Sequence, residues 1–310
     1  MVEVIALGAA NTDLLFHVKE FPKERSEVLS KFFEASSGGS AANYLVGLAR
    51  LGAKTAMIGV IGRDLFGERL YSELKTEGVG TSRVRRVETP SGVVAAVVDE
   101  KGDRRLFTFI GANEEVRDYD VTVEFLADAK HVHITSLASE EAFKAMVKAK
   151  DIAIAAGLSV SVGPGQILAD KGLEKIKPLI EGIDILFLNE REAKVLSGEK
   201  DLESAIAELL KYAKILSVTR SGKGCMVRTR SEKIELPAFK VKVIDTIGSG
   251  DAFAAAFTYA FLRKKPLEEC AMLGSAAGAY CATGPGARHL PRHRELEELL
   301  NSQMQAASSR

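Results

Sequence analysis

Short apolar runs alternate with helical stretches along most of the chain. Such continuous apolar runs are typical of strands in a parallel sheet that helices cover on both faces. Strands are expected at 4–7, 56–61, 132–134, 185–188 and 215–218. Helices are expected between them, at 41–51, 140–150, 173–181 and 202–212. No long repeat or low-complexity linker interrupts the alternation, so the pattern predicts one doubly wound α/β unit.

Two segments break this alternation, 28–35 and 93–110. Both show strand-like alternation without an intervening helix, and the second contains a hairpin turn signal at 99–103. On pattern alone, they could form a separate small sheet or edge strands of the main sheet.

The composition indicates an ordinary globular protein of 310 residues, 46% of them hydrophobic. Lys plus Arg and Asp plus Glu are both 42, so the zero net charge suggests neither a nucleic-acid nor an anionic-membrane partner. No apolar run approaches the roughly 18 to 20 residues of a membrane span, and the N-terminal residues resemble a strand rather than a signal peptide. We therefore expect a cytoplasmic protein.

Several common sites are not indicated by the sequence. Cys225, Cys270 and Cys281 are odd in number and lack Cys-x-x-Cys spacing, so we expect buried free thiols rather than disulfides or a zinc site. No P-loop motif is present, and no Gly-x-Gly-x-x-Gly follows the first strand. An NAD-dependent dehydrogenase is therefore disfavoured.

The most informative motif is DTIGSGDAF at 245–253, a glycine turn and a carboxylate directly before an apolar helix. Gly248, Ser249 and Gly250 leave room for an anion beside the free amides and positive dipole end of that helix. Beside a bound phosphate, Asp251 would serve as a general base that takes a proton from an attacking hydroxyl. An ordinary helix start capped by Asp is the alternative interpretation.

This motif resembles the C-terminal signature of the ribokinase-like (PfkB) carbohydrate kinase family. The stretch SGGSAAN at 37–43 resembles a second family signature, and further similarity covers 61–67, 111–113, 188–192 and 219–224. The resemblance implies a single ribokinase-like domain over 1–310, in which about 12–38 and 91–113 form a small β-sheet lid. It also implies an ATP-dependent kinase that transfers the γ-phosphoryl group to a hydroxyl of a sugar such as ribose or fructose.

The resemblance assigns the catalytic and cofactor residues. Asp251 matches the family's base, and the amides around Gly248, Ser249 and Gly250 match its anion hole. Because the transition state of phosphoryl transfer is loose, an unperturbed carboxylate is expected to be basic enough. Asn189 and Glu192 match a motif associated with Mg²⁺, bound through water, although the glutamate would also favour a helix N-terminus.

Two loops match the family's nucleotide site. The first contains Thr219, Ser221, Gly222 and Gly224, with Ser221 where many members have glycine, and the second contains Gly284 and Gly286. Asn189 is also expected on the nucleotide side. Asp245, Ile247 and Gly286 match a K⁺ site that some members have.

For the acceptor, the positions that match the family's sugar-binding residues are Asp13, Gly38, Gly39 and Asn43, with Arg105 and Asn113 on or beside the lid. A nucleoside kinase shares every motif named above. A sugar-phosphate kinase is a further alternative, in which Arg105 would pair with a second phosphate. A non-catalytic nucleotide or metabolite sensor is disfavoured because Asp251 is present. Relatives often pair through their lids, so we expect a homodimer.

Overall fold

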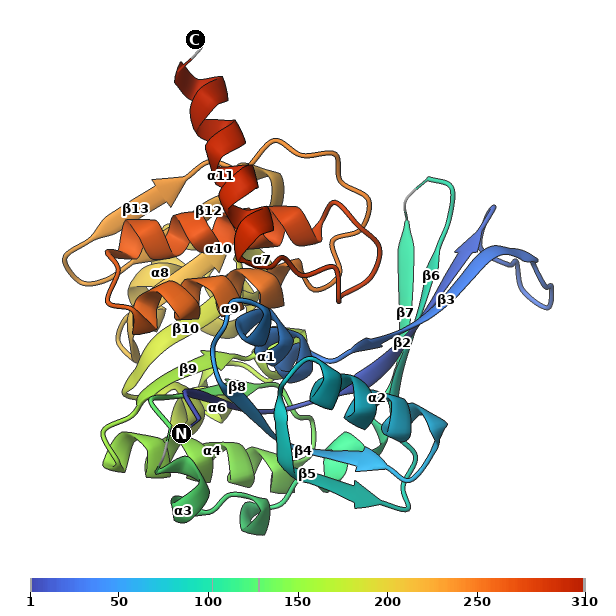
Figure 1. The fold of residues 1–310 in the computed structure, drawn as a ribbon, viewed down its shortest axis with the longest axis horizontal. Helices are drawn as coiled ribbons and strands as arrows, with labels where there is room; N and C mark the ends of the chain where they lie inside the picture. The colour runs from blue at the N-terminus through green and yellow to red at the C-terminus, as the bar shows by residue number, and fades with distance from the viewer. Residues whose placement is uncertain (1, 102, 128, 309–310) are drawn as a thin grey trace.

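A nine-stranded sheet forms the centre of the computed structural model, which describes residues 2–101, 103–127 and 129–308 (Figure 1). The strand order is β13-β12-β11-β10-β9-β8-β1-β4-β5, and every neighbouring pair from β11 to β5 is parallel. The strands are β1 Val4–Leu7, β4 Thr55–Gly62, β5 Gly80–Val87, β8 His131–Thr135, β9 Ser159–Gly163, β10 Ile183–Asn189, β11 Ala213–Thr219, β12 Cys225–Arg228 and β13 Lys233–Leu236.

Helices cover both faces of this sheet and enclose two hydrophobic cores. In β1, Ile5 and Leu7 pack into one core while Val4 and Ala6 pack into the other, so the strand is apolar at every position. One face is covered by α1 Ser40–Arg50, α2 Leu65–Thr76, α9 Ser249–Leu262, α10 Leu267–Cys281 and α11 His293–Ser308. The other is covered by α3 Val123–Leu126, α4 Glu140–Ala155, α5 Gly165–Ala169, α6 Leu173–Ile180, α7 Glu190–Ser197 and α8 Leu202–Leu209.

A separate four-stranded sheet projects from this body (Figure 1). Its order is β3-β2-β6-β7, with antiparallel outer pairs and a parallel central pair. The strands are β2 Asn11–Val18, β3 Ser30–Gly38, β6 Gly92–Val98 and β7 Arg104–Phe109. We call it the small sheet.

The predicted fold class is confirmed, including the five strands and four helices expected between 4 and 218, although several ends shift by a few residues. The strand-like segments 28–35 and 93–110 fall in the small sheet rather than at an edge of the main sheet. Strands β5, β9, β12 and β13 were not predicted, and β12 and β13 run antiparallel. In the expected hairpin turn at 99–103, Asp99 accepts hydrogen bonds from the amides of Lys101 and Asp103, while residue 102 lies outside the described residues.

Two features of the fold position the site. Helices α1 and α9 pack against each other, and strands β10 and β11 end side by side, with Asn189 opposite Thr219. Ligands of doubly wound folds bind beyond the carboxyl ends of the parallel strands. Within the described part of the chain, no helix has the length and apolar character that crossing a membrane requires.

Candidate active site

Asp251 lies where the N-terminal turns of α1 and α9 meet. Its Oδ1 accepts a hydrogen bond from Ser40 Oγ at 2.5 Å, and its Oδ2 accepts one from Asn43 Nδ2 at 2.8 Å. The two sequence signatures, about 200 residues apart in the chain, therefore form one site. Two helix N-termini direct their positive dipole ends at this point, which favours a bound anion.

The environment of Asp251 changes its proton affinity. Burial raises the pKa of its carboxyl, while the hydrogen bonds from Ser40 and Asn43 and the charge of Arg288 oppose that rise. The net direction is upward, so the carboxyl departs from the unperturbed state that was expected to be sufficient. A carboxylate with a raised pKa is a stronger base than a free aspartate.

The turn before α9 combines a left-handed residue with open space. Gly248 is the N-cap of α9 at φ 79°, and a Cβ there would lie 2.7 Å from Ala287 Cα, so a larger residue does not fit. Nothing lies within 4 Å of a Cβ built on Gly250, which leaves room for a ligand. Ser249 does not offer the free amide that was expected, because its N–H donates to Thr246 O at 3.2 Å. As first-turn groups, the N–H of Gly250 and Asp251 have no helical carbonyl to bind.

Asp13 of β2 lies against the end of β3. A Cβ on Gly38 would lie 2.1 Å from Asp13 Oδ2, so the glycine is what lets the carboxylate approach the strand. Burial raises the pKa of Asp13 to about 7, with Arg288 lowering it and Asp251 and Asp245 adding to the rise. Asp13 therefore belongs to the same electrostatic site as Asp251. Gly39 follows as the N-cap of α1.

Of the two predicted residues on or beside the lid, Asn113 lies next to the start of β2, and Arg105 lies on the face of the small sheet opposite Asp13. Asn113, in the short 3₁₀ helix η1 Gly111–Glu115, accepts from the amide of Ala10 and donates to Ala10 O, Asn11 Oδ1 and Ile110 O. It thus ties the segment after β7 to the start of β2. Arg105 lies beside Val97 of β6, which lies beside Phe16 of β2. Phe16 is three positions from Asp13, and side chains alternate between the two faces along a strand. Arg105 therefore lies on the face of the small sheet opposite Asp13. Its guanidinium stacks on Phe21, 4.1 Å from the ring centre.

Asn189 and Glu192 form a capping box at the start of α7. Asn189 Oδ1 accepts from the amide of Glu192 at 2.8 Å, and Glu192 Oε2 accepts from the amide of Asn189 at 2.9 Å. Burial raises the pKa of Glu192, and the neighbouring Asp251 charge contributes to that rise. The helix-start role is therefore present, and the carboxylate also lies near the site. Among the described residues, no three His, Cys, Asp or Glu side chains gather into a metal cluster, so a cation beside Glu192 would depend on phosphate oxygens and water.

The first nucleotide-loop candidate follows β11. Thr219 ends the strand, and a Cβ built on Gly222 would meet open space. Ser221 has a left-handed backbone at φ 49°, which explains why glycine suits this position. Gly224, at φ 89°, closes the turn against Leu236 O.

The second loop is joined to the turn before α9 by Asp245. Its Oδ1 accepts from the amide of Ile247 at 3.0 Å and its Oδ2 from the amide of Gly286 at 3.1 Å. The three residues expected at a K⁺ site thus lie together, and both carboxylate oxygens hold backbone N–H groups. Gly284 packs against His289 in the same loop.

Sequence reasoning missed two residues of this site, Ser40 and Arg288. Ser40 directly follows the glycine pair at the start of α1, and this first-turn position was the available signal. Arg288 comes from the loop after α10, only two residues beyond Gly286, and no pattern indicated that its side chain is buried.

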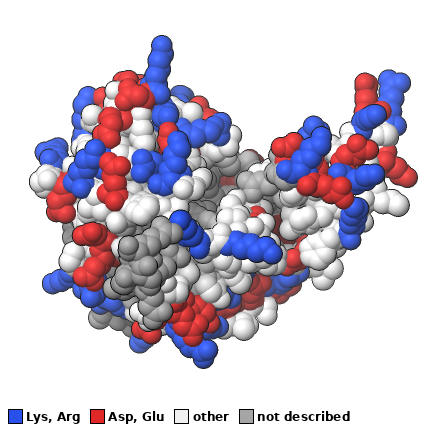
Figure 2. All heavy atoms as spheres, turned by 90° about the horizontal axis from the view of Figure 1, so that it is seen from above, with Lys and Arg blue, Asp and Glu red and all other residues white. Residues whose placement is uncertain are grey.

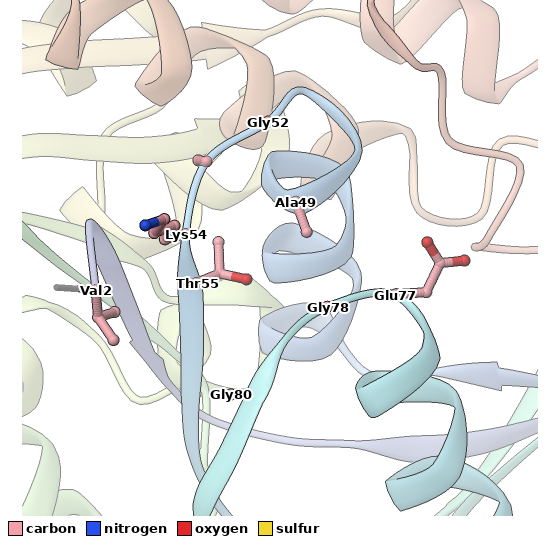
Figure 3. A pocket seen from close by; sticks show the side chains of 9 residues that line it. Val2, Ala49, Gly52, Lys54, Thr55, Glu77, Gly78 and Gly80 are labelled. Atoms are coloured by element: carbon pink, nitrogen blue, oxygen red, sulfur yellow. The ribbon is translucent and has the colours of Figure 1, made fainter.

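The surface is hollowed between the main body and the projecting small sheet (Figure 2). A different cavity, of about 490 Å³, lies at the start of strands β1, β4 and β5 and is lined by Val2, Thr55, Glu77 and Gly80, among others (Figure 3). That cavity is at the amino-terminal edge of the parallel strands, away from Asp251. The candidate site is therefore the group around Asp251.

The three cysteines and the two histidines of β8 are buried in the core. Cys225, Cys270 and Cys281 are buried free thiols, as predicted. His131 and His133 share Ser161 Oγ as a hydrogen-bond partner, at 2.7 Å from each ring. Burial lowers the pKa of His131 to about 4, so both rings belong to a neutral buried network.

Comparisons with known proteins identify the family. The family model described as pfkB family carbohydrate kinase matches residues 1–294. An uncharacterized sugar kinase from Archaeoglobus fulgidus is 33% identical over 80% of this chain and 99% of its own. An ATP-dependent ribose-1-phosphate kinase from Halopiger xanaduensis is 31% identical over 94% of this chain and 95% of its own.

A solved structure gives the same result. The nucleoside kinase of Methanocaldococcus jannaschii has a TM-score of 0.81 at 26% identity, covering 97% of this chain and 99% of its own. The chain therefore belongs to the pfkB family of carbohydrate kinases and is an ATP-dependent phosphotransferase that acts on a hydroxyl group of a sugar or nucleoside.

Proposed function

We propose that the chain transfers the γ-phosphoryl group of ATP to a hydroxyl of a ribose- or fructose-like sugar, with Asp251 as the general base. The observation that carries this proposal is the position of Asp251 at two converging helix N-termini, held by Ser40 and Asn43. A carboxylate there lies beside donors that would attract the phosphate, and each of its oxygens is already oriented. A mere helix cap would not need donors from a second helix.

In the proposed step, the acceptor oxygen attacks the γ-phosphorus as its proton moves to Asp251. A new O–P bond forms, the bond from the γ-phosphorus to the bridging oxygen breaks, and ADP leaves with the electron pair. First-turn amides such as that of Gly250 would stabilise the charge on the migrating phosphoryl group. The raised pKa of Asp251 helps the carboxylate to take the proton.

The acceptor would lie between the small sheet and α1. Asp13 supplies a carboxylate and Asn43 a buried amide oxygen that has no hydrogen-bond partner among the described groups. Gly38 and Gly39 allow the sugar to approach the backbone. A carboxylate and an amide together can both accept from and donate to vicinal hydroxyls.

For the cofactors, we assign ATP to the loops that contain Thr219, Ser221, Gly222, Gly224, Gly284 and Gly286. Asn189 and Glu192 would hold Mg²⁺ through water; when bound, Mg²⁺ neutralises charge on the phosphates. Asp245, Ile247 and Gly286 would border a K⁺ site. The shared position of these three residues supports that assignment.

Two other acceptor classes are suggested by the relatives, one of which is a ribose-1-phosphate kinase and another a nucleoside kinase. The deciding experiment is an ATP-dependent kinase screen over ribose, fructose, ribose 1-phosphate, adenosine, inosine and cytidine. We expect a free sugar to give the highest kcat/KM. Preference for a nucleoside or a sugar phosphate would replace the sugar assignment, and inactivity on every acceptor class would contradict the kinase itself.

We further propose that residues 1–310 act as one kinase domain in which the small sheet, within about 12–38 and 91–113, is a lid that also joins two subunits. Phe33, Phe107 and Phe109 lie on the face of the small sheet opposite Asp13 and are 56%, 64% and 53% exposed. Its outer strands, β3 and β7, pair on one edge only with other strands of the described residues. Exposed aromatic side chains and open edges are features that a dimer interface would cover.

A further inference from the structure

Arg288 is a largely buried cation that the proposed reaction does not use. Its side chain is 11% exposed. Nε donates to Ser37 O at 3.2 Å and Nη1 to Ala42 O at 3.1 Å, while Nη2 is buried without a partner among the described groups. A guanidinium fixed by two main-chain carbonyls has little freedom to move.

The two carbonyls belong to the segments that present the site. Ser37 comes directly before the Gly38–Gly39 pair, and Ala42 lies between Ser40 and Asn43 in the first turn of α1. Arg288 itself belongs to the loop whose Gly286 is held by Asp245. One side chain therefore links the acceptor side of the site to the predicted nucleotide loop.

Charged groups surround Arg288 from several elements. Asp13 of β2 and Asp251 of α9 both experience its positive charge. Glu73 Oε1 of α2 lies 3.7 Å from Nε, and Glu77, which follows α2, adds negative charge, while Arg50 of α1 opposes the cation. Glu73 also accepts a hydrogen bond from Ser37 Oγ.

We propose that Arg288 is a positioning residue of the phosphoryl-transfer site: it fixes the starts of the glycine pair and of α1, and it places a permanent positive charge beside Asp13 and Asp251. The inference rests on the proposed function of Asp251. Arginine suits both roles because its planar fork can bind two carbonyls at once and stays charged, whereas a lysine offers one compact ammonium.

The charge has a consequence that a purely structural role lacks. Arg288 lowers the pKa of both Asp13 and Asp251 against the effect of burial. Without the cation, both carboxyls would keep their protons up to a higher pH. The active enzyme, in which they are ionised, would then form only at a higher pH. The acid limb of the pH profile of kcat/KM reports this ionisation in the free enzyme.

The test is that profile, measured between about pH 5 and pH 9 for the wild type, Arg288→Met and Arg288→Lys. For Arg288→Met we expect the midpoint of the acid limb to rise by about one pH unit, a tenfold change in proton affinity. For Arg288→Lys we expect the midpoint to stay near the wild-type value while kcat falls, because the charge remains and the two-carbonyl geometry is lost. The lysine variant also covers the case in which the methionine variant does not fold.

Arg50→Met is the matched control. Arg50 donates to the carbonyls of Arg288 and Leu290, at 3.0 and 2.8 Å, so it holds the same loop. Its charge is not among the influences on Asp13 or Asp251. We expect Arg50→Met to lower the melting temperature without moving the acid limb.

The inference would be overturned if the acid limb stayed in place in Arg288→Met or moved equally in Arg50→Met. A shifted acid limb in Arg288→Lys would overturn it too. A wild-type profile without an acid limb would overturn it as well. These outcomes differ from a failure of the proposed function, in which the wild type itself would not phosphorylate any acceptor.

Discussion

Asn43 Nδ2 donates to Asp251 Oδ2 at 2.8 Å, across 208 residues of sequence. Together with Ser40 Oγ on Oδ1, this bond attaches the α9 carboxylate to the first turn of α1. Both donors stabilise the ionised carboxylate and partly offset the effect of burial on its pKa. The start of α1 therefore controls the charge of Asp251 as well as its position.

Ser40→Ala should make the enzyme more sensitive to acid. Removing one hydrogen bond to the carboxylate raises the pKa of Asp251 further, because that bond now lowers it. We expect activity near pH 6 to fall by roughly five- to tenfold, with a smaller loss near pH 8.5, since a charge-assisted hydrogen bond contributes about 1.5 kcal/mol or more. Ser40→Thr keeps the hydroxyl and is the control. Equal losses at both pH values would contradict the role.

Asp13→Asn should stabilise the fold at high pH while weakening acceptor binding. Because the folded pKa of Asp13 is about 7, above its ordinary value of 3.8, the folded protein keeps a proton that the unfolded chain has already released between these values. The free energy of unfolding therefore falls as the pH rises from about 4 to about 7, by up to roughly 4 kcal/mol, because ionisation of Asp13 favours the unfolded chain.

Chemical denaturation at about pH 5 and pH 8 measures this difference. We expect the free energy of unfolding of Asp13→Asn to exceed that of the wild type more at pH 8 than at pH 5. A gain that does not depend on pH would show that Asp13 is not held in the environment described.

Ser221→Gly should stabilise the loop after β11. Ser221 has a φ of 49°, where a side chain is strained and glycine is not. We expect the free energy of unfolding to rise by about 0.5 to 1 kcal/mol in chemical denaturation. Ser231→Gly is the control, because Ser231 lacks a positive φ and its replacement should lower stability. A loss in Ser221→Gly equal to that of the control would contradict the strain.

Phe107→Asp should separate the proposed dimer. The side chain is 64% exposed on the outer face of the small sheet, where a charge would be costly at an interface. Light scattering of the wild type is expected to give twice the chain mass of 33.4 kDa, and the variant a single chain. A wild type at one chain mass would contradict the dimer, and a variant that still pairs would place the interface elsewhere.

The sequence predicted the fold class because strands of a covered parallel sheet are buried on both faces and largely apolar, as β1 and β4 are. Strand β13 was missed because only Ile234 and Leu236 of its four residues are apolar and partly buried. Strand β5 was missed because Arg83, Arg85 and Arg86 interrupt its apolar pattern. Tertiary contacts decide such strands: Arg85, for example, pairs with Asp120 at 2.8 Å.

Of the candidate site, too, the sequence indicated some residues and missed others. The motifs indicated Asp251 and Asn43 because glycine turns next to helix starts leave a local pattern, whereas Asp13 was predicted from the family resemblance. Arg288 was missed because its role depends on carbonyls more than 240 residues earlier in the chain. Arg105 was predicted as an acceptor residue because of its place on the lid. The sequence alone does not show which face of β7 its side chain occupies.

The most direct test of the central claim is the turnover of Asp251→Asn. Asparagine keeps the size of the side chain and removes the base. Asp201→Asn is the control, because Asp201 caps another helix, α8, where its side chain accepts from the amide of Ser204. We expect Asp251→Asn to bind ATP and acceptor nearly as the wild type does, by calorimetry, while kcat falls by roughly 100- to 10,000-fold. A variant that binds both ligands and keeps wild-type turnover would contradict the account.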